Sequence, residues 1–412
     1  MRRRENRFLK GCVVLCAVLI LAVATGIVGM LKDTGFVSKE KLTFFTEQAA
    51  PVVKTQEVPA GEVEEKFYYQ ALNEEEKRVY ETILQGIREN QKGIDVPMTE
   101  AKRVNQIFQF VLNDFPDIFW CSGAAETTAY QIPEGRYAQI CPEYTYEGET
   151  KEQMQRKINA ETKAFLEQVQ EIQSASEYDR IKYVYEYVIR TVDYVADASD
   201  SQNLFSALVG KESVCAGYAR ETQYLLEKLG VFCTYVTGTT RGQPHAWNLV
   251  RCEGNYYYVD TTWGDPVFLQ SDPSEISEAQ QIQYDYLCCN EEELFRTHEL
   301  DGEVPMPSCT SLQDNYYVRE GCYYQRFDKE RMRKQLNTEI SAGKEVSVFK
   351  FSGKAAYEES RQILLNNLIR EGASNLAAWY QLSSARYSYQ DDEVLYVVLG
   401  IVLLVLMAGI VR

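Results

Sequence analysis

Three residues suited to nucleophilic catalysis follow one another along the chain: Cys215, His245 and Asp260. Cys215 stands directly before a stretch whose inner-face residues have the spacing of a helix, and Gly230 is placed to end that helix. We therefore predict that Cys215 occupies the first turn of a helix, where unpaired amides and the positive end of the helix dipole stabilise a thiolate. The same amides could hold the oxyanion of an acyl intermediate. A single cysteine is more commonly a small buried side chain, so this residue alone decides nothing.

The downstream segment "PHAWNLVRCEGNYYYVDTTWGDP" predicts two paired strands. A two-residue turn at Glu253–Gly254 would make a tight hairpin and pair His245 with Thr262. Alternation of side chains then places Asp260 diagonally next to His245 on one face, within hydrogen-bond reach. Cysteine, histidine and aspartate in this arrangement make a nucleophile, a base and an orienting group. The alternative is a core histidine and an aspartate that caps the end of a strand.

Three blocks, "SVCAGYA", "HAWNLV" and "YYVDTTWGDP", resemble the signature blocks of the transglutaminase-like superfamily. The resemblance covers about residues 175–300 and includes "YDRIKYVYEYVIRTVDY", "QNLFSALVGKESVC" and "YDYLCCNEEELFRTHEL". It implies a core of the papain-type cysteine-peptidase fold. Carried over to this chain, it makes Cys215 the nucleophile, His245 the general base and Asp260 the residue that orients His245.

Four further residues have weaker assignments. An amide donor at Gln202 could complete an oxyanion hole, although a glutamine that satisfies a loop is the more common case. Trp247 and Trp263 flank the histidine and the aspartate and could shield the site from water, or could be core residues. His298 is predicted to cap or pack against a helix. No acidic calcium loop and no zinc-type cysteine pattern occurs, so we expect no metal and no cofactor.

The net charge of −17 argues against nucleic acid as a partner, because binding to a phosphate backbone needs clustered Lys and Arg. Two apolar runs predict a location at the cell membrane. Residues 11–31 carry no charge and follow a basic segment, which favours an anchor with its N-terminus in the cytoplasm over a cleaved signal peptide. Residues 394–411 predict a second span, with a core strand as the alternative. The bulk of the chain would then be extracytoplasmic.

Helices followed by antiparallel strands predict the α+β class, with a cysteine helix packed on an antiparallel sheet. We expect six segments: a cytoplasmic tail and transmembrane anchor (1–35), a linker (36–64), an N-terminal α+β region (65–172), the transglutaminase-like catalytic domain (173–303), a C-terminal α+β region (304–390) and a second transmembrane helix (391–412).

Eight cysteines remain after Cys215 and the two in the first apolar run are set aside, an even number that permits disulfides outside the cell. The conceivable pairs are Cys121 with Cys141, Cys233 with Cys252, and Cys309 with Cys322. Free buried thiols are an equally good interpretation.

The combined prediction is a membrane-anchored enzyme that attacks peptide or protein amides, including those of cell-wall or surface proteins, through a thioester on Cys215. Water or a second amine would resolve the thioester, giving hydrolysis or cross-linking. The alternatives are a non-catalytic surface module with the same fold that binds peptide or wall polymer, and a structural envelope protein.

Overall fold

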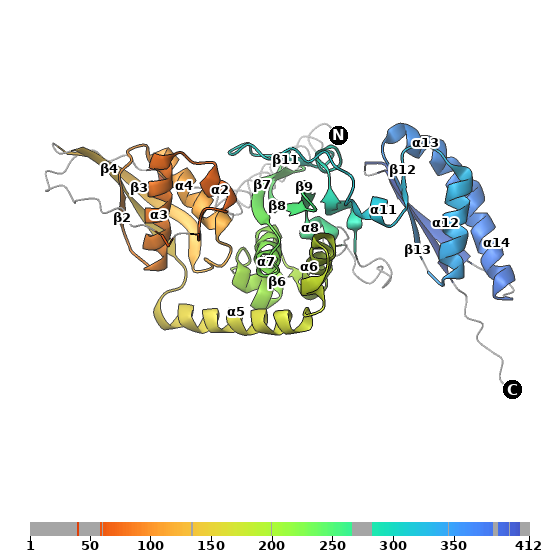
Figure 1. The fold of residues 1–412 in the computed structure, drawn as a ribbon, viewed down its shortest axis with the longest axis horizontal. Coiled ribbons are helices and arrows are strands. Elements are labelled where there is room, and N and C mark those ends of the chain that lie inside the picture. The colour runs from red at the N-terminus through yellow and green to blue at the C-terminus, as the bar shows by residue number, and fades with distance from the viewer. Residues whose placement is uncertain are drawn as a thin grey trace, which may run out of the picture. The chain divides into compact units, whose positions relative to one another are not determined.

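The computed structural model describes residues 39–40, 58–59, 61–132, 135–198, 200–265, 282–344, 346–381, 386–394 and 396–403 (Figure 1). The chain divides into two compact units. The first comprises residues 1–166 with 202–210, and the second comprises residues 167–201 with 211–412.

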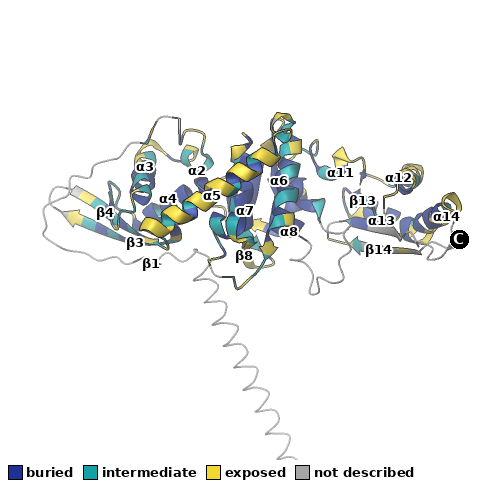
Figure 2. Cartoon of the chain, turned by 90° about the horizontal axis from the view of Figure 1, so that it is seen from below, coloured by how far each residue is buried: buried dark blue, intermediate teal, exposed yellow. Residues whose placement is uncertain are grey.

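The first unit combines a four-stranded sheet, in the order β1-β3-β4-β2, with helices that carry apolar faces. Asn73 and Glu76 have the three-residue spacing that predicts a capping box, and they form one at the start of α3. The apolar stripes of α3 and α4 are buried (Figure 2). Its elements are α2 (Phe67–Gln70), α3 (Glu74–Arg88), α4 (Ala101–Asp114), α5 (Gly148–Gln168), β1 (Lys39–Glu40), β2 (Ile94–Val96), β3 (Cys121–Ile132) and β4 (Gly135–Tyr144).

The second unit contains the segment with the candidate catalytic residues. Its main sheet has five antiparallel strands in the order β10-β9-β8-β7-β11, and α7 packs against β7 and β8. The elements of this part are α6 (Glu177–Thr191), β5 (Asp193–Tyr194), β6 (Glu212–Ser213), α7 (Cys215–Lys228), β7 (Cys233–Thr240), β8 (Gln243–Cys252), β9 (Asn255–Val259), α8 (Thr261–Gly264), β10 (Leu287–Cys289), α10 (Glu291–Leu294) and β11 (His298–Leu300).

The turn between β8 and β9 has the two residues that the sequence predicts. Glu253 and Gly254 both have positive φ, 48° and 87°, as a type I′ hairpin turn requires. The expected pairing of His245 with Thr262 is wrong, however, because β9 ends at Val259 and Thr262 lies in the short helix α8. The side chain of Asp260 accepts from the first amides of α8 and so takes the chain out of the sheet.

The C-terminal part of the second unit has a mixed sheet in the order β12-β13-β15-β14. The expected transmembrane helix over 394–411 is wrong for Val397–Leu403, which form β15 and pair with β13 on one side and β14 on the other. A continuous apolar run suits a strand in the middle of a sheet as well as a helix, and the alternative of a core strand holds here. The elements are α11 (Tyr316–Arg319), β12 (Tyr323–Tyr324), α12 (Lys329–Ser341), β13 (Val346–Phe351), α13 (Lys354–Ile363), α14 (Ile369–Trp379), β14 (Arg386–Asp392) and β15 (Val397–Leu403).

Within the described part of the chain, no helix has the length and apolar character to cross a bilayer. The first apolar run, residues 11–31, and residues 404–411 of the second lie outside the described residues.

The three conceivable disulfides are not formed. Cys141 carries a free thiol and lies opposite Glu126 in the β3–β4 pair. Cys252 is also free and contacts Cys288, while Cys309 and Cys322 are both free.

Candidate active site

Cys215 is the first residue of α7, as its position before the amphipathic stretch predicts. Val214 precedes it in an extended conformation and supplies no side-chain acceptor to the helix start, although its backbone carbonyl accepts from the amide of Gly217 at 3.0 Å. The thiol forms no disulfide, and the residue is only half-buried. The inner face of α7 is buried as predicted, at Tyr218, Thr222, Leu225, Leu226 and Leu229.

Buried polar contacts fix α7 against the sheet. Asn248 of β8 donates from Nδ2 to the carbonyl of Ala219, at 2.9 Å. Thr222 and Thr261 share a hydrogen bond of 3.1 Å between their hydroxyls, which connects α7 to α8. Because each contact is buried, its loss would leave unpaired polar groups in the core, so the position of Cys215 relative to β8 is well constrained.

His245 and Asp260 form a buried pair. The imidazole lies on β8, and its Nε2 is 2.7 Å from Oδ2 of Asp260. The side chains are 3% and 1% exposed, so water does not compete for this contact. After Asp260, Cys215 is the second group whose interaction with His245 raises the pKa of the imidazole. Since Nε2 is occupied by the aspartate, Nδ1 is the ring nitrogen that remains for the sulfur.

Electrostatics favour a charged imidazole at this position. Burial acts to lower the pKa of His245, but the negative charge of Asp260, together with the contacts to Asp260 and Cys215, raises it to about 10. For Asp260, burial acts to raise the pKa of the carboxyl, yet the charge of His245 and hydrogen bonds from both histidines hold it well below its usual range. The site therefore holds an imidazolium and a carboxylate at neutral pH.

Oδ1 of Asp260 has a separate task. It accepts from the amides of Thr262 and Trp263, at 2.8 and 3.0 Å, and so caps the helix α8. The alternative interpretation of Asp260 as a capping residue thus holds together with its contact to His245. Rotation of the carboxylate would break both sets of contacts, which fixes Oδ2 in its direction toward the imidazole.

A second histidine on the same carboxylate was not anticipated. His298 lies in β11, not against a helix as expected, and its Nε2 is 3.0 Å from Oδ2 of Asp260. Its Nδ1 is 2.7 Å from Oγ1 of Thr297. An ionised carboxylate can only accept, so Nε2 of His298 carries the proton and donates to Asp260. The rarity of histidine was the available signal, because the chain has only two and both contact Asp260.

Trp247 and Trp263 are both buried core residues beside this pair of imidazoles. The ring centroid of His298 lies 5.1 Å from that of Trp247 and 5.4 Å from that of Trp263. The ring of His245 stacks on Trp247 with centroids 5.9 Å apart. Core packing and exclusion of water, the two interpretations of the tryptophans, are thus compatible here.

Gln202 belongs to the segment 202–210, which groups with the first unit. Its role as an oxyanion donor stays a prediction.

Among the described residues, His245, Asp260 and His298 form a group whose possible metal-ligating atoms all lie within 4.8 Å of one another. Those atoms are the ones already used in the hydrogen bonds from the imidazoles to Asp260. A metal ion would have to displace the proton on Nε2 of His245, and the raised pKa of that imidazole opposes this. The hydrogen-bonded arrangement fits the residues better than a metal centre does.

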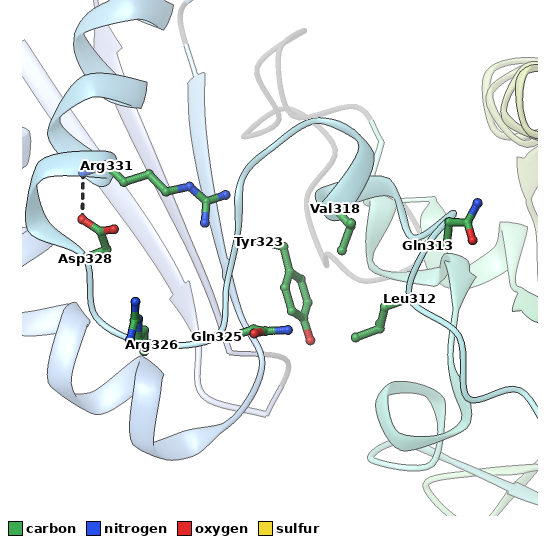
Figure 3. A pocket seen from close by; sticks show the side chains of 8 residues that line it. All are labelled: Leu312, Gln313, Val318, Tyr323, Gln325, Arg326, Asp328 and Arg331. Atoms are coloured by element: carbon green, nitrogen blue, oxygen red, sulfur yellow. Dashed lines mark hydrogen bonds between the residues drawn. The ribbon is translucent and has the colours of Figure 1, made fainter.

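Two hollows lie in the second unit. One, of about 350 Å³, reaches His298 and is also lined by Arg241, Trp263 and Arg296. The other, of about 480 Å³, contains none of the candidate catalytic residues. Figure 3 shows Leu312 and Val318 of the latter facing Tyr323 and Gln325. Only the first hollow touches a residue that contacts Asp260.

Comparison with known proteins places a known family within the chain. Residues 164–261 match the family model of the transglutaminase-like superfamily. The chain contains a transglutaminase-like domain. All three of Cys215, His245 and Asp260 fall inside the matched range, and the helices and antiparallel strands of the domain have the mixed α and β character that the resemblance implies.

Individual relatives of the transglutaminase-like domain are distant. The mouse kyphoscoliosis peptidase is 26% identical over 106 residues, which are 22% of this chain and 16% of the mouse protein. A solved structure described as a TGase is 15% identical, with a TM-score of 0.26, over 45% of this chain and 53% of that one. A candidate cysteine protease of Cytophaga hutchinsonii is 14% identical, with a TM-score of 0.21, over 33% and 61% of the two chains. The chain thus spans only part of each, and at these TM-scores the two structures carry no argument.

Proposed function

We propose that the transglutaminase-like domain is a cysteine-dependent acyltransferase or peptidase that acts on peptide or protein amides. The observation that carries this proposal is the half-buried free thiol of Cys215 at a helix start, in electrostatic interaction with a buried His245 that Asp260 holds. Nucleophile, base and orienting group are the roles that this contact pattern supports.

The charged state of the imidazole suggests how the steps run. The sulfur attacks the amide carbonyl, and amides at the start of α7 stabilise the oxyanion. The imidazolium of His245 gives its proton to the leaving amine, which expels the amine and leaves a thioester. The now neutral imidazole then takes a proton from water or from a second amine, which attacks the thioester. Hydrolysis or amide transfer results, and Cys215 is regenerated.

We further propose that residues 11–31 anchor the protein in the cell membrane with the catalytic domain on the extracytoplasmic side. The uncharged length of this run and the five basic residues before it support the orientation. Substrates would then be peptides or proteins of the cell surface or cell wall.

Thiol reactivity tests the catalytic proposal without a known substrate. The full chain is treated with iodoacetamide at pH 6, and alkylation is followed on the tryptic peptides that contain Cys215 and Cys141. Cys141 is a control within the same molecule, because it is also a half-buried free thiol but burial, followed by Glu126 and Asp95, raises its pKa. We expect Cys215 to react first, faster than in the urea-unfolded chain.

Turnover is tested with surface or wall peptides, comparing the wild type with Cys215→Ala by mass spectrometry. New amine-linked glutamines indicate a transferase and new termini indicate a peptidase. Alkylation of Cys215 at the rate of the unfolded chain, together with no new product, would contradict the proposal and favour a binding module.

A further inference from the structure

Lys350 is a buried lysine in the middle of the C-terminal sheet. It lies on β13, where Tyr323 of β12 and Val397 of β15 are its neighbours in register. Its side chain is 1% exposed, and it is the one buried lysine among the described residues. An ammonium group removed from water in this way is costly unless it is closely paired.

Two buried carboxylates face this lysine. Nζ of Lys350 is 2.8 Å from Oδ1 of Asp285 and 3.9 Å from Oε1 of Glu293. The carboxylates are 2% and 5% exposed, and the ring of Tyr317 covers the cluster, with its centroid 5.5 Å from Nζ. One cation therefore faces two acids in a space that excludes water.

The two acids differ in their surroundings. Oε2 of Glu293 accepts from Nδ2 of Asn315, at 2.9 Å, but Oε1 is buried with no hydrogen-bond partner among the described residues. Burial raises the pKa of Glu293 although the charge of Lys350 opposes the shift. Asp285, by contrast, is hydrogen-bonded to both Lys350 and Tyr317. Glu293 is thus the acid with an atom available for proton transfer, and Asp285 is the one held against the amine.

We propose that Lys350 and Asp285 become joined by an intramolecular amide bond, and that Glu293 carries the proton in its formation. Transfer of one proton within the ion pair gives a neutral amine and a carboxylic acid. Nζ attacks Cγ of Asp285, Oε1 of Glu293 takes a proton from the nitrogen, and this proton passes to the departing hydroxyl. The N–C bond forms, one C–O bond breaks and one water leaves, with no oxidation or reduction.

Three features favour this reaction over a permanent ion pair. The nitrogen is already in contact with an oxygen of the carboxyl group that it attacks, and it cannot move away because its strand is central in the sheet. The product removes two charges from a site without water. The unpartnered oxygen of Glu293 lies on the side of the amine, where a proton acceptor is needed.

The bond is detected on the full chain, digested with trypsin under reducing conditions. Trypsin does not cleave after an acylated lysine, so residues 345–354 should remain in one piece and be joined to residues 252–296, which contain Asp285. The branched peptide should weigh one water less than the sum of its two parts. Fragmentation should place the branch between Lys350 and Asp285.

Variants separate the roles of the groups. Lys350→Arg and Asp285→Ala should give only linear peptides, and Glu293→Gln should lose or strongly slow the cross-link while the protein stays folded. Cys215→Ala should retain it, because the transglutaminase-like site takes no part. Linear peptides alone from the folded wild type would overturn the proposal, and so would a cross-link that depends on Cys215 or persists in Lys350→Arg. The wild-type digest decides the matter even if a variant fails to fold.

Discussion

Replacement of Asp260 by asparagine isolates the charge that holds His245 in its protonated form. The substitution keeps the size of the side chain, and an amide oxygen can still accept from the amides that Oδ1 caps. The amide nitrogen would face Nε2 of His245 and of His298, in place of the carboxylate oxygen. Because this nitrogen donates, it favours an imidazole whose proton has moved to Nδ1, the nitrogen that remains for Cys215.

The size of the effect follows from the pKa of His245, which lies at about 10 in place of 6.5. At 1.36 kcal/mol for each pKa unit, the surroundings favour the charged ring by roughly 5 kcal/mol. Burial acts in the opposite direction, so removing the carboxylate should lower the pKa of His245 strongly, with Cys215 left as the remaining group that raises it. The ring would then be neutral at pH 7 and carry its proton on the wrong nitrogen. Loss of the orienting aspartate in such a triad costs about 10⁴ in kcat.

Nitrogen-15 NMR of the imidazoles measures this directly. The chain has only two histidines, so a single His298→Gln spectrum assigns both rings. In the wild type we expect His245 to stay protonated through neutral pH, and in Asp260→Asn to titrate near or below its ordinary range. Iodoacetamide rates at Cys215, measured on the same samples at pH 6, should fall toward the rate of the unfolded chain.

One result would refute this reasoning. If His245 in a folded Asp260→Asn variant still titrates near pH 10, another group supplies its charge. An unchanged alkylation rate at Cys215 would likewise show that the carboxylate does not act on the sulfur through the imidazole.

Three further predictions concern the same core. His298→Gln should lower the free energy of unfolding by about 1.5–3 kcal/mol in urea titrations, because the Asp260 carboxylate loses a buried hydrogen bond. Thr239→Ala is the control and should change this free energy little; Thr239 lies on β7, opposite Glu299 of β11. The wild type should lose stability as pH rises through about 10, the pKa of His245 in the folded protein. Because this pKa is raised above the value of about 6.5 in the unfolded chain, the stabilisation is complete below about pH 6.5 and is lost as the folded imidazole deprotonates. If the thermal midpoint of His245→Gln fell with pH in the same way, the prediction would be contradicted. Gly238→Ala should destabilise by about 3 kcal/mol, because its Cβ would overlap the carbonyl oxygen of Glu299 and the ring of Trp247, and a midpoint equal to that of the wild type would show that β11 can shift freely.

The sequence was sufficient for local features of the fold. The position of Cys215 at a helix start follows from the spacing of the residues behind it, and the hairpin follows from a turn that only certain residues form readily. The capping box could be predicted for the same reason, since its partners Asn73 and Glu76 are three residues apart. The helix start, the turn and the capping box each depend on residues that are close together in the chain, so they can be read from the sequence.

The second apolar run, residues 394–411, was predicted to be a transmembrane helix, and this was wrong for the part that forms β15. Residues 397–403 form β15, which pairs with β13 on one edge and β14 on the other, and Val397 and Val398 are buried. Length and hydropathy alone cannot separate such a strand from part of a membrane helix. The difference depends on which strands pair with it, and those come from elsewhere in the chain.

The amino-acid sequence by itself determined that a cysteine at a helix start is followed by a histidine and an aspartate within a segment that resembles the transglutaminase-like superfamily. Only the tertiary structure decided that His298 from β11 shares the carboxylate of Asp260, and that Lys350 lies buried between two acids. The physical reason is range. A helix start or a tight turn is specified by residues a few positions apart. His298 and Asp260 are 38 positions apart and Lys350 and Asp285 are 65 apart, so these contacts arise only when the sheets assemble.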